Sequence, residues 1–160
     1  MAEQETGNDT LGNELAEILS QVTRLAGFRA RVEWERRTSG ELYANVRSKR
    51  SDGLLIGRSG ETLRSLQLVV QSILQHRHPG VNIPNVTIDV GGYKRRREDF
   101  LKRKALAIAR VVIETKREMS LDPLTEKEYK IVKEALMEQG KVRIHTVGSG
   151  YRKNVIIAPR

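Results

Sequence analysis

The hydrophobic residues of the first ninety positions follow two periods, which predict a mixture of helices and strands. Apolar residues three or four apart indicate amphipathic helices, and strict alternation indicates half-buried strands. The expected elements are a helix at 10–26, strands at 28–36 and 42–46, a short helix ending at Ile56, a longer helix from Glu61 to about 77, and a strand at 86–90. The first two strands flank a turn and should pair antiparallel. The predicted order is α-β-β-α-α-β.

Two finer expectations concern the helices of this region. Asp52 is a residue type that caps helices, so it should cap the short helix. The longer helix should bury the apolar residues that its period places on one face, namely Leu63, Leu66, Val69, Val70 and Ile73.

The second part of the chain follows a break at Gly91-Gly92. A long charged helix is expected at about 93–119, followed by a turn at Asp122-Pro123. Thr125 and Glu128 resemble a capping box, which predicts a helix to about 138. Strands should follow at 142–146 and 154–158, giving the order α-α-β-β. We therefore expect an α+β protein with two small domains, residues 10–91 and 92–160, after a disordered tail at 1–9.

Composition and charge point to a partner class. The 160 residues carry 29 Lys and Arg against 20 Asp and Glu, a net charge of +9, and no cysteine. The excess lies in residues 93–160, with 18 basic and 9 acidic groups, whereas residues 1–50 hold 8 of each. A basic block of this kind is typical of polyanion binding, most often nucleic acid. The polar first ten residues and the lack of a long apolar run predict a cytoplasmic protein without an integral membrane segment.

The most informative motif is Gly57-Arg58-Ser59-Gly60, which joins the short helix to the longer one. Glycine at both ends allows a tight turn and close approach of a ligand's backbone. The following helix offers free N–H groups to a phosphate, and Arg58 adds a charge. The residues expected to bind RNA at this loop and its groove wall are Leu55, Ile56, Gly57, Arg58, Ser59, Gly60, Thr62 and Leu63.

This loop and its element order resemble a type II KH domain, whose GXXG loop clamps single-stranded backbone. A phosphate-binding P-loop is excluded as an alternative, because Gly53 and Gly57 have three residues between them and Arg58 stands where that motif has lysine.

The expected long helix carries a basic ridge. Arg96, Arg103, Arg110 and Arg117 recur every seven residues, which is about 10 Å along one face of a helix. Such a ridge could follow a phosphate backbone, or it could be a solvated face. The cluster at 94–97 favours a polyanion partner because its like charges repel one another.

From Leu121 onward the chain resembles an R-three-H domain. The resemblance is carried by Leu121-Asp122-Pro123-Leu124, Glu128, residues 146–153 and residues 155–159. Tyr129 and Lys133 stand where that family has its arginine and histidine, so Lys133 would meet a phosphate only as a point charge. The nucleic-acid contacts expected in this part of the chain are Arg95, Arg96, Arg103, Lys133, Thr146, Ser149, Gly150, Tyr151, Arg152 and Lys153.

A KH domain followed by an R-three-H domain is the arrangement of the bacterial Jag (KhpB) family, which residues 10–160 resemble. We expect the family's N-terminal Jag domain to be absent. The resemblance implies a single-stranded RNA-binding protein in post-transcriptional, cell-shape or division regulation. It also allows pairing with a second small KH protein and peripheral association with a membrane.

Enzymatic readings are weaker than a binding function. His76 and His78 have no nearby carboxylate or cysteine in the sequence, so a metal pair is not favoured, and Asp52 and Asp89 are too isolated to suggest a nuclease. We expect no cofactor, no metal and no catalytic residue. The alternative function is a protein-interaction or assembly factor at the ribosome or membrane insertase.

Overall fold

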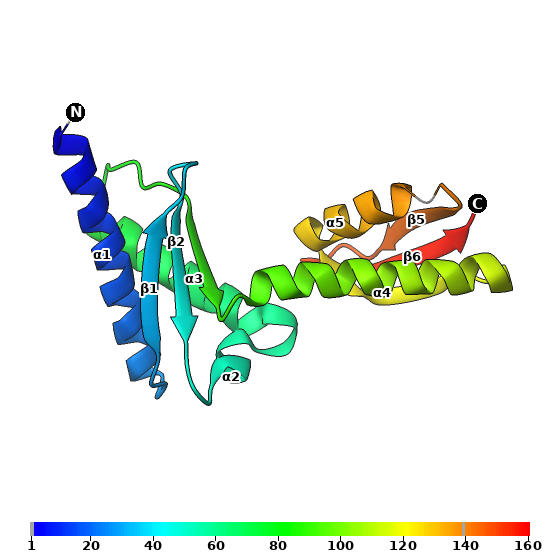
Figure 1. Ribbon diagram of the computed structural model, residues 1–160, viewed down its shortest axis with the longest axis horizontal. Helices are drawn as coiled ribbons and strands as arrows, with labels where there is room; N and C mark the ends of the chain where they lie inside the picture. Colours follow the sequence, from blue (N-terminus) through cyan, green and yellow to red (C-terminus); the bar gives the residue numbers. More distant parts are fainter. Residues whose placement is uncertain (1, 139) are drawn as a thin grey trace. The chain divides into compact units, whose positions relative to one another are not determined.

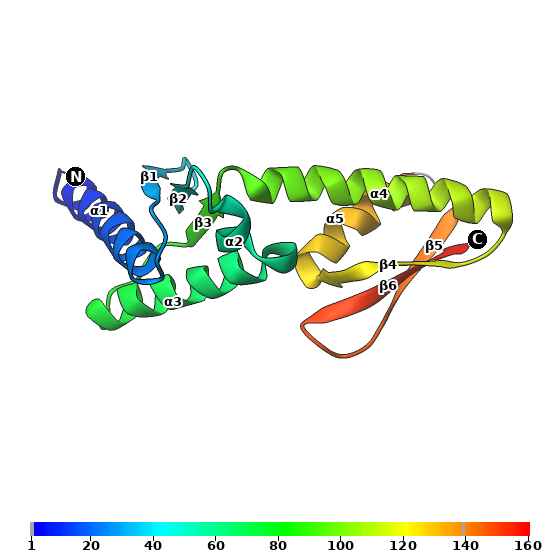
Figure 2. The same ribbon diagram turned by 90° about the horizontal axis from the view of Figure 1, so that it is seen from below.

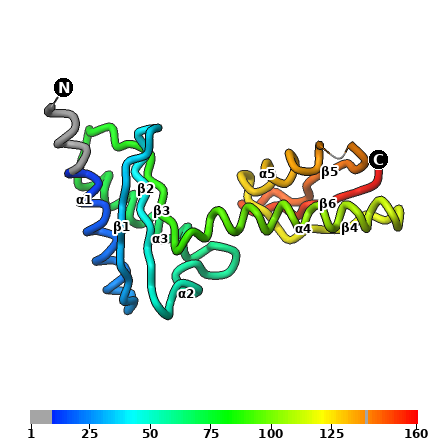
Figure 3. Tube along the Cα trace, viewed as in Figure 1, coloured from blue at the N-terminus to red at the C-terminus, as the bar shows by residue number. Residues whose placement is uncertain are grey.

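The computed structural model describes residues 2–138 and 140–160, with side chains from Thr10 onward. The chain forms two compact units, the first ending at Lys94 and the second beginning at Arg95 (Figures 1 and 3). This division falls three residues after the predicted boundary between Gly91 and Gly92. The predicted tail at 1–9 lies outside the residues whose side chains are described.

The first unit has the element order that the sequence predicts. Its elements are α1 (Ala2–Leu25), β1 (Arg31–Arg36), β2 (Leu42–Arg47), α2 (Asp52–Ile56), a 3-10 turn (Arg58–Gly60), α3 (Glu61–Arg77) and β3 (Val86–Val90). The sheet order is β1-β2-β3, with β1 antiparallel and β3 parallel to β2. A parallel pair needs a crossover connection. Here that crossover consists of α2, the glycine loop and α3.

The helices α1 and α3 cover one face of this sheet (Figures 1 and 2). Alternate residues of β2 and β3 are fully buried against them, with Leu42 beside Val86 and Ala44 beside Ile88. The prediction for Val69 was wrong, because its side chain is 48% exposed. The buried stripe of α3 instead contains Leu63, Val70 and Leu74, with Leu66 and Ile73 partly buried beside it.

The second unit contains a strand that the sequence did not reveal. Its elements are α4 (Tyr93–Thr115, whose first two residues belong to the first unit), β4 (Met119–Thr125), α5 (Glu126–Met137), β5 (Val142–Val147) and β6 (Arg152–Pro159). The sheet is antiparallel in the order β4-β6-β5. The predicted turn at Asp122-Pro123 is wrong, since both residues lie within β4. The pairing with β6 shifts register between Leu121 and Leu124, and this irregularity accommodates the proline inside a strand.

The core of the second unit lies between its helices and the sheet. The buried stripe of α4 consists of Leu101, Ala105, Ala109 and Val112, and it ends with the helix at Thr115 rather than near Met119. The predicted capping box is confirmed, because the Thr125 hydroxyl accepts from the Glu128 N–H and the Glu128 carboxylate accepts from the Thr125 N–H. Together, the helices and the two three-stranded sheets confirm the predicted mixed α+β class.

Candidate nucleic-acid interface

The loop between α2 and α3 has a backbone that favours glycine at both of its ends. Gly57 has φ 72° and ψ −177°, and Gly60 has φ 84° and ψ 15°. A Cβ at Gly57 would collide with the Thr62 side chain and lie 2.8 Å from the Thr62 nitrogen. A Cβ at Gly60 would lie 3.0 Å from the Tyr93 ring. Gly57 is therefore required by local geometry, and at Gly60 the left-handed backbone and the nearby Tyr93 ring disfavour a side chain, independently of any ligand.

The apolar residues on either side of the loop anchor it to the hydrophobic core of the first unit. Leu55 and Leu63 were expected in a groove wall, but they are only 2% and 3% exposed and lie in the hydrophobic core. They anchor the loop and do not present a surface to a ligand. Ile56 also packs against this core and is partly buried. The apolar side chain beside the loop that does face solvent is Leu54, 66% exposed, which the sequence reasoning did not single out.

The tip of the loop carries the groups that a phosphate could meet. Arg58 and Thr62 are exposed, while Ser59 is half-buried with a left-handed φ of 51°. The Gly57 N–H donates to the Gly53 carbonyl at 2.9 Å, and the Gly60 N–H donates to the Gly57 carbonyl at 3.3 Å. The loop is thus a closed turn that presents a guanidinium at its tip.

A buried carboxylate fixes the end of β3 and the start of α4. Asp89, 3% exposed, accepts hydrogen bonds from the Tyr43 hydroxyl at 2.9 Å, the Val90 N–H at 2.8 Å and the Lys94 N–H at 3.1 Å. Burial, followed by the hydrogen bond to Asp89, raises the pKa of Tyr43 to about 12. These contacts give Asp89 a structural role. They hold the segment that carries Tyr93, the ring behind Gly60.

One other sequence expectation needs correction near this loop. Asp52 does not cap α2 with its side chain, because Ser51 is the N-cap residue and makes no side-chain capping bond. The Asp52 carboxylate instead accepts from the Ser48 N–H at 2.7 Å, which closes the preceding turn. At the far end of α3, His78 Nε2 lies 2.6 Å from the Glu14 carboxylate and ties α3 to α1. This contact, followed by the bond from Arg77, lowers the pKa of Glu14.

The basic ridge of α4 has three members on the helix and not four. Arg96, Arg103 and Arg110 are exposed on α4, whereas Arg117 lies beyond the end of that helix. Arg95 is exposed beside Arg96. Arg97, from the same cluster, is instead a structural residue: its Nε donates to the Glu128 carboxylate at 2.9 Å, and its side chain is 15% exposed. The ridge that could face a phosphate chain is therefore shorter than predicted.

The expected contacts around the β5–β6 turn lie on different elements. Thr146 is half-buried on β5, and the turn residues Ser149, Gly150 and Tyr151 are exposed. Two cations of β6 have partners: Arg152 donates to the Pro123 carbonyl at 3.4 Å, and Lys153 lies 3.2 Å from the Glu126 carboxylate.

The two residues at the R-three-H positions lie on α5 and differ in exposure. Lys133 is exposed, whereas Tyr129 is half-buried and packs against the core of the second unit. Tyr129 thus supports the core, and Lys133 is the one of the two that faces solvent.

Comparison with known proteins identifies the family. The chain is 32% identical over 151 residues to a Clostridium symbiosum protein named RNA-binding protein KhpB, covering 94% of this chain and 67% of that protein. The chain belongs to the KhpB family. Two other proteins of that name in this family are similar: one from Lactiplantibacillus plantarum, 31% identical over 161 residues, and one from Bacillus subtilis, 32% identical over 107 residues.

The extent of these KhpB matches differs between relatives. The match to the Lactiplantibacillus plantarum protein covers 100% of this chain and 48% of that protein. The match to the Bacillus subtilis protein covers 66% of this chain and 50% of that protein. The aligned parts thus span about half the length of these two relatives. No family model matches the chain. In the described part of the chain, no helix combines the length and the apolar character that crossing a bilayer requires.

Proposed function

We propose that this chain binds single-stranded RNA, with the loop 57–60 holding the RNA backbone and the basic second unit adding phosphate contacts. Relatives of the same family are named RNA-binding proteins, which supports the substrate class. The observation that carries the proposal is the loop itself. Backbone hydrogen bonds close the turn, and Thr62 and Tyr93 leave little room for side chains at its two glycines, so the exposed Arg58 is presented on a preformed turn.

The proposed role is that of a cytoplasmic, non-enzymatic regulator acting after transcription. The loop offers the exposed guanidinium of Arg58, which suits a phosphodiester. Asp89 is saturated by three donors, which argues for a structural role and not for a nuclease carboxylate. Pairing with a second small KH protein is part of the same proposal.

The test is fluorescence anisotropy with a labelled single-stranded RNA at two salt concentrations. The variant Arg58→Asp/Ser59→Asp changes the charge by −3. It should weaken binding about tenfold or more, since a hydrogen bond to a charged group is worth about 1.5–3 kcal/mol. A control of equal charge, Lys130→Asp/Lys127→Gln, alters exposed residues of α5. It reports the general effect of net charge.

The outcomes separate the candidate functions. A loss specific to the loop variant, with the far-UV circular dichroism of the wild type, supports the proposal. Equal losses in both variants would move the site away from the loop. No RNA binding by the wild type would reject the proposal and favour the protein-interaction or assembly factor.

A further inference from the structure

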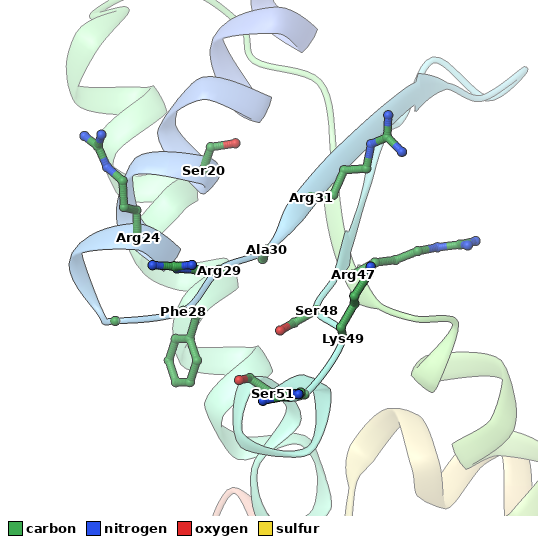
Figure 4. A pocket seen from close by; sticks show the side chains of 12 residues that line it. Ser20, Arg24, Phe28, Arg29, Ala30, Arg31, Arg47, Ser48, Lys49 and Ser51 are labelled. Atoms are coloured by element: carbon green, nitrogen blue, oxygen red, sulfur yellow. The ribbon is translucent and has the colours of Figure 1, made fainter.

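Besides the glycine loop, the first unit has another basic site, which lies at the end of β2 that leads into α2. It is a pocket of about 890 Å³ between the C-terminal end of α1, the start of β1 and the turn after β2 (Figure 4). Its cationic lining residues are Arg24, Arg29, Arg31, Arg47, Lys49 and Arg50. Among the residues whose side chains are described, no acidic one lines it. The pocket therefore gathers six of the eight cations of residues 1–50 and none of the five carboxylates of this segment whose side chains the structure describes.

These cations have few partners within the protein. Arg31 lies 3.8 Å from the Glu33 carboxylate, and both side chains are largely exposed. Within the part of the chain that the structure describes, none of the other five forms an ion pair. Arg31 and Arg47 are also direct cross-strand partners in the pairing of β1 with β2. Like charges directly opposite each other destabilise a sheet, and a bound anion would relieve that repulsion.

The rest of the lining suits a nucleotide. The hydroxyl groups of Ser48 and Ser51 point toward the side where the Phe28 ring lies (Figure 4). Phe28 is partly buried against the hydrophobic core, which fixes its ring. Hydroxyl groups can bond to phosphate or sugar oxygens, and an aromatic ring offers a surface for a base. The pocket thus combines cations, hydroxyl groups and an apolar ring.

We propose that this pocket binds backbone phosphates of the same RNA strand that the glycine loop holds. This inference rests on the RNA-binding function proposed above and extends the binding site beyond the loop. The short helix α2 joins the two places, with Ser51 at its start and Gly57 at its end. Six residues of helix span roughly 9 Å, so a strand leaving the loop reaches the pocket within a few nucleotides. The exposed cations suit a strand passing over the pocket.

The test compares RNA lengths. A tetranucleotide matches the length that a GXXG loop clamps, whereas a dodecanucleotide of single-stranded RNA can also reach the pocket. The variant Arg29→Gln/Arg50→Gln removes two charges, keeps the aliphatic stems and breaks no ion pair of the described residues. The control Lys127→Gln/Lys130→Gln removes the same charge from α5. Dissociation constants are measured by anisotropy over a series of potassium chloride concentrations.

The expected result is selective for the long RNA. The pocket variant should weaken dodecanucleotide binding and lower the slope of log K against log salt by about 1.4, since each phosphate contact contributes about 0.7 for single strands. Tetranucleotide binding should stay within twofold of the wild type, and the control should lower the slope by less than the pocket variant does. Unchanged far-UV circular dichroism and Trp34 fluorescence establish that the variants are folded.

Other results would overturn the inference. If Arg58→Asp/Ser59→Asp weakens both RNAs but the pocket variant matches its control, the pocket proposal fails and the RNA-binding function stands. If the wild type binds neither RNA, the RNA-binding function fails and the pocket proposal with it. Sodium tripolyphosphate tests a compact anion. If the wild type binds tripolyphosphate, and the pocket variant loses this binding but keeps its affinity for the dodecanucleotide, the pocket is a site for a free polyphosphate and the RNA proposal fails.

Discussion

Replacing Gly57 by alanine tests whether the loop geometry is intrinsic to the fold. The backbone of Gly57, with φ 72° and ψ −177°, lies in a region that essentially only glycine occupies. The added Cβ would meet both the side chain and the backbone nitrogen of Thr62, the latter at 2.8 Å. Because the nitrogen belongs to the first turn of α3, the collision cannot be relieved by a side-chain rotation alone.

The structure allows the size of the effect to be worked out. A residue forced into such a backbone region costs about 1–3 kcal/mol. Overpacking against fixed neighbours costs about 1–3 kcal/mol more. Gly53, four residues earlier within α2, provides a matched control because a Cβ there meets nothing within 4 Å. Gly53→Ala should stabilise the first unit by about 0.5–1 kcal/mol. The two substitutions should therefore differ by about 3 kcal/mol or more.

Urea unfolding followed by the fluorescence of Trp34 measures this difference. Trp34 is the only tryptophan of the chain, and its side chain packs against the core of the first unit, so it reports the unfolding of that unit. The free energy of unfolding of Gly57→Ala should fall while its urea m-value stays unchanged. A Gly57→Ala protein as stable as Gly53→Ala would refute the argument that the loop needs glycine for its own geometry.

Three further predictions concern contacts outside the loop. Glu14→Gln should lower stability at pH 7 by about 0.5–1 kcal/mol. The contact with His78 lowers the pKa of Glu14 below its ordinary 4.5. The stability that ionised Glu14 contributes is therefore full above pH 4.5 and is lost as the pH falls through the lowered pKa. Urea titrations of both proteins at several pH values check this. Thr125→Ala should lower the free energy of unfolding of the second unit by about 1 kcal/mol, because it removes the hydroxyl that accepts from the Glu128 N–H at the start of α5. Urea unfolding followed by far-UV circular dichroism measures this, and an unchanged unfolding transition would contradict it. Gly12→Ala should shift the tryptophan emission, because the new Cβ would collide with the indole ring, and an unaltered spectrum would count against that packing.

Periodicity predicted most elements because it reflects local geometry. The order α-β-β-α-α-β of the first unit follows directly from apolar spacings and from turn residues. The strand β4 was missed because its apolar residues Leu121 and Leu124 are separated by Asp122-Pro123, a pair typical of turns. Only pairing with β6, more than 25 residues away, makes this segment a strand. Such pairing leaves no periodic signal in the segment itself.

The candidate sites were predicted to different degrees. The loop 57–60 was recognisable because its glycines are required locally. The burial of Leu63 was predicted from the apolar period of the long helix α3. The burial of Leu55 was not, since the five-residue helix α2 is too short for its apolar spacing to tell the inner face from the outer one. The basic pocket could not be predicted from composition, because residues 1–50 hold equal numbers of basic and acidic groups. Only the fold brings six of the cations together in one pocket.

The parallel pairing of β2 with β3 also has a consequence for the order in which the chain is made. The β1–β2 hairpin is complete once Arg47 has been synthesised, whereas β2 must wait for Val86 to Val90 before it gains its second neighbour. The ring of Tyr93, which backs Gly60, follows later still. A chain emerging from the ribosome therefore contains both strands of its hairpin before it contains the third strand of the sheet. The glycine loop likewise leaves the ribosome more than thirty residues before the ring that backs Gly60.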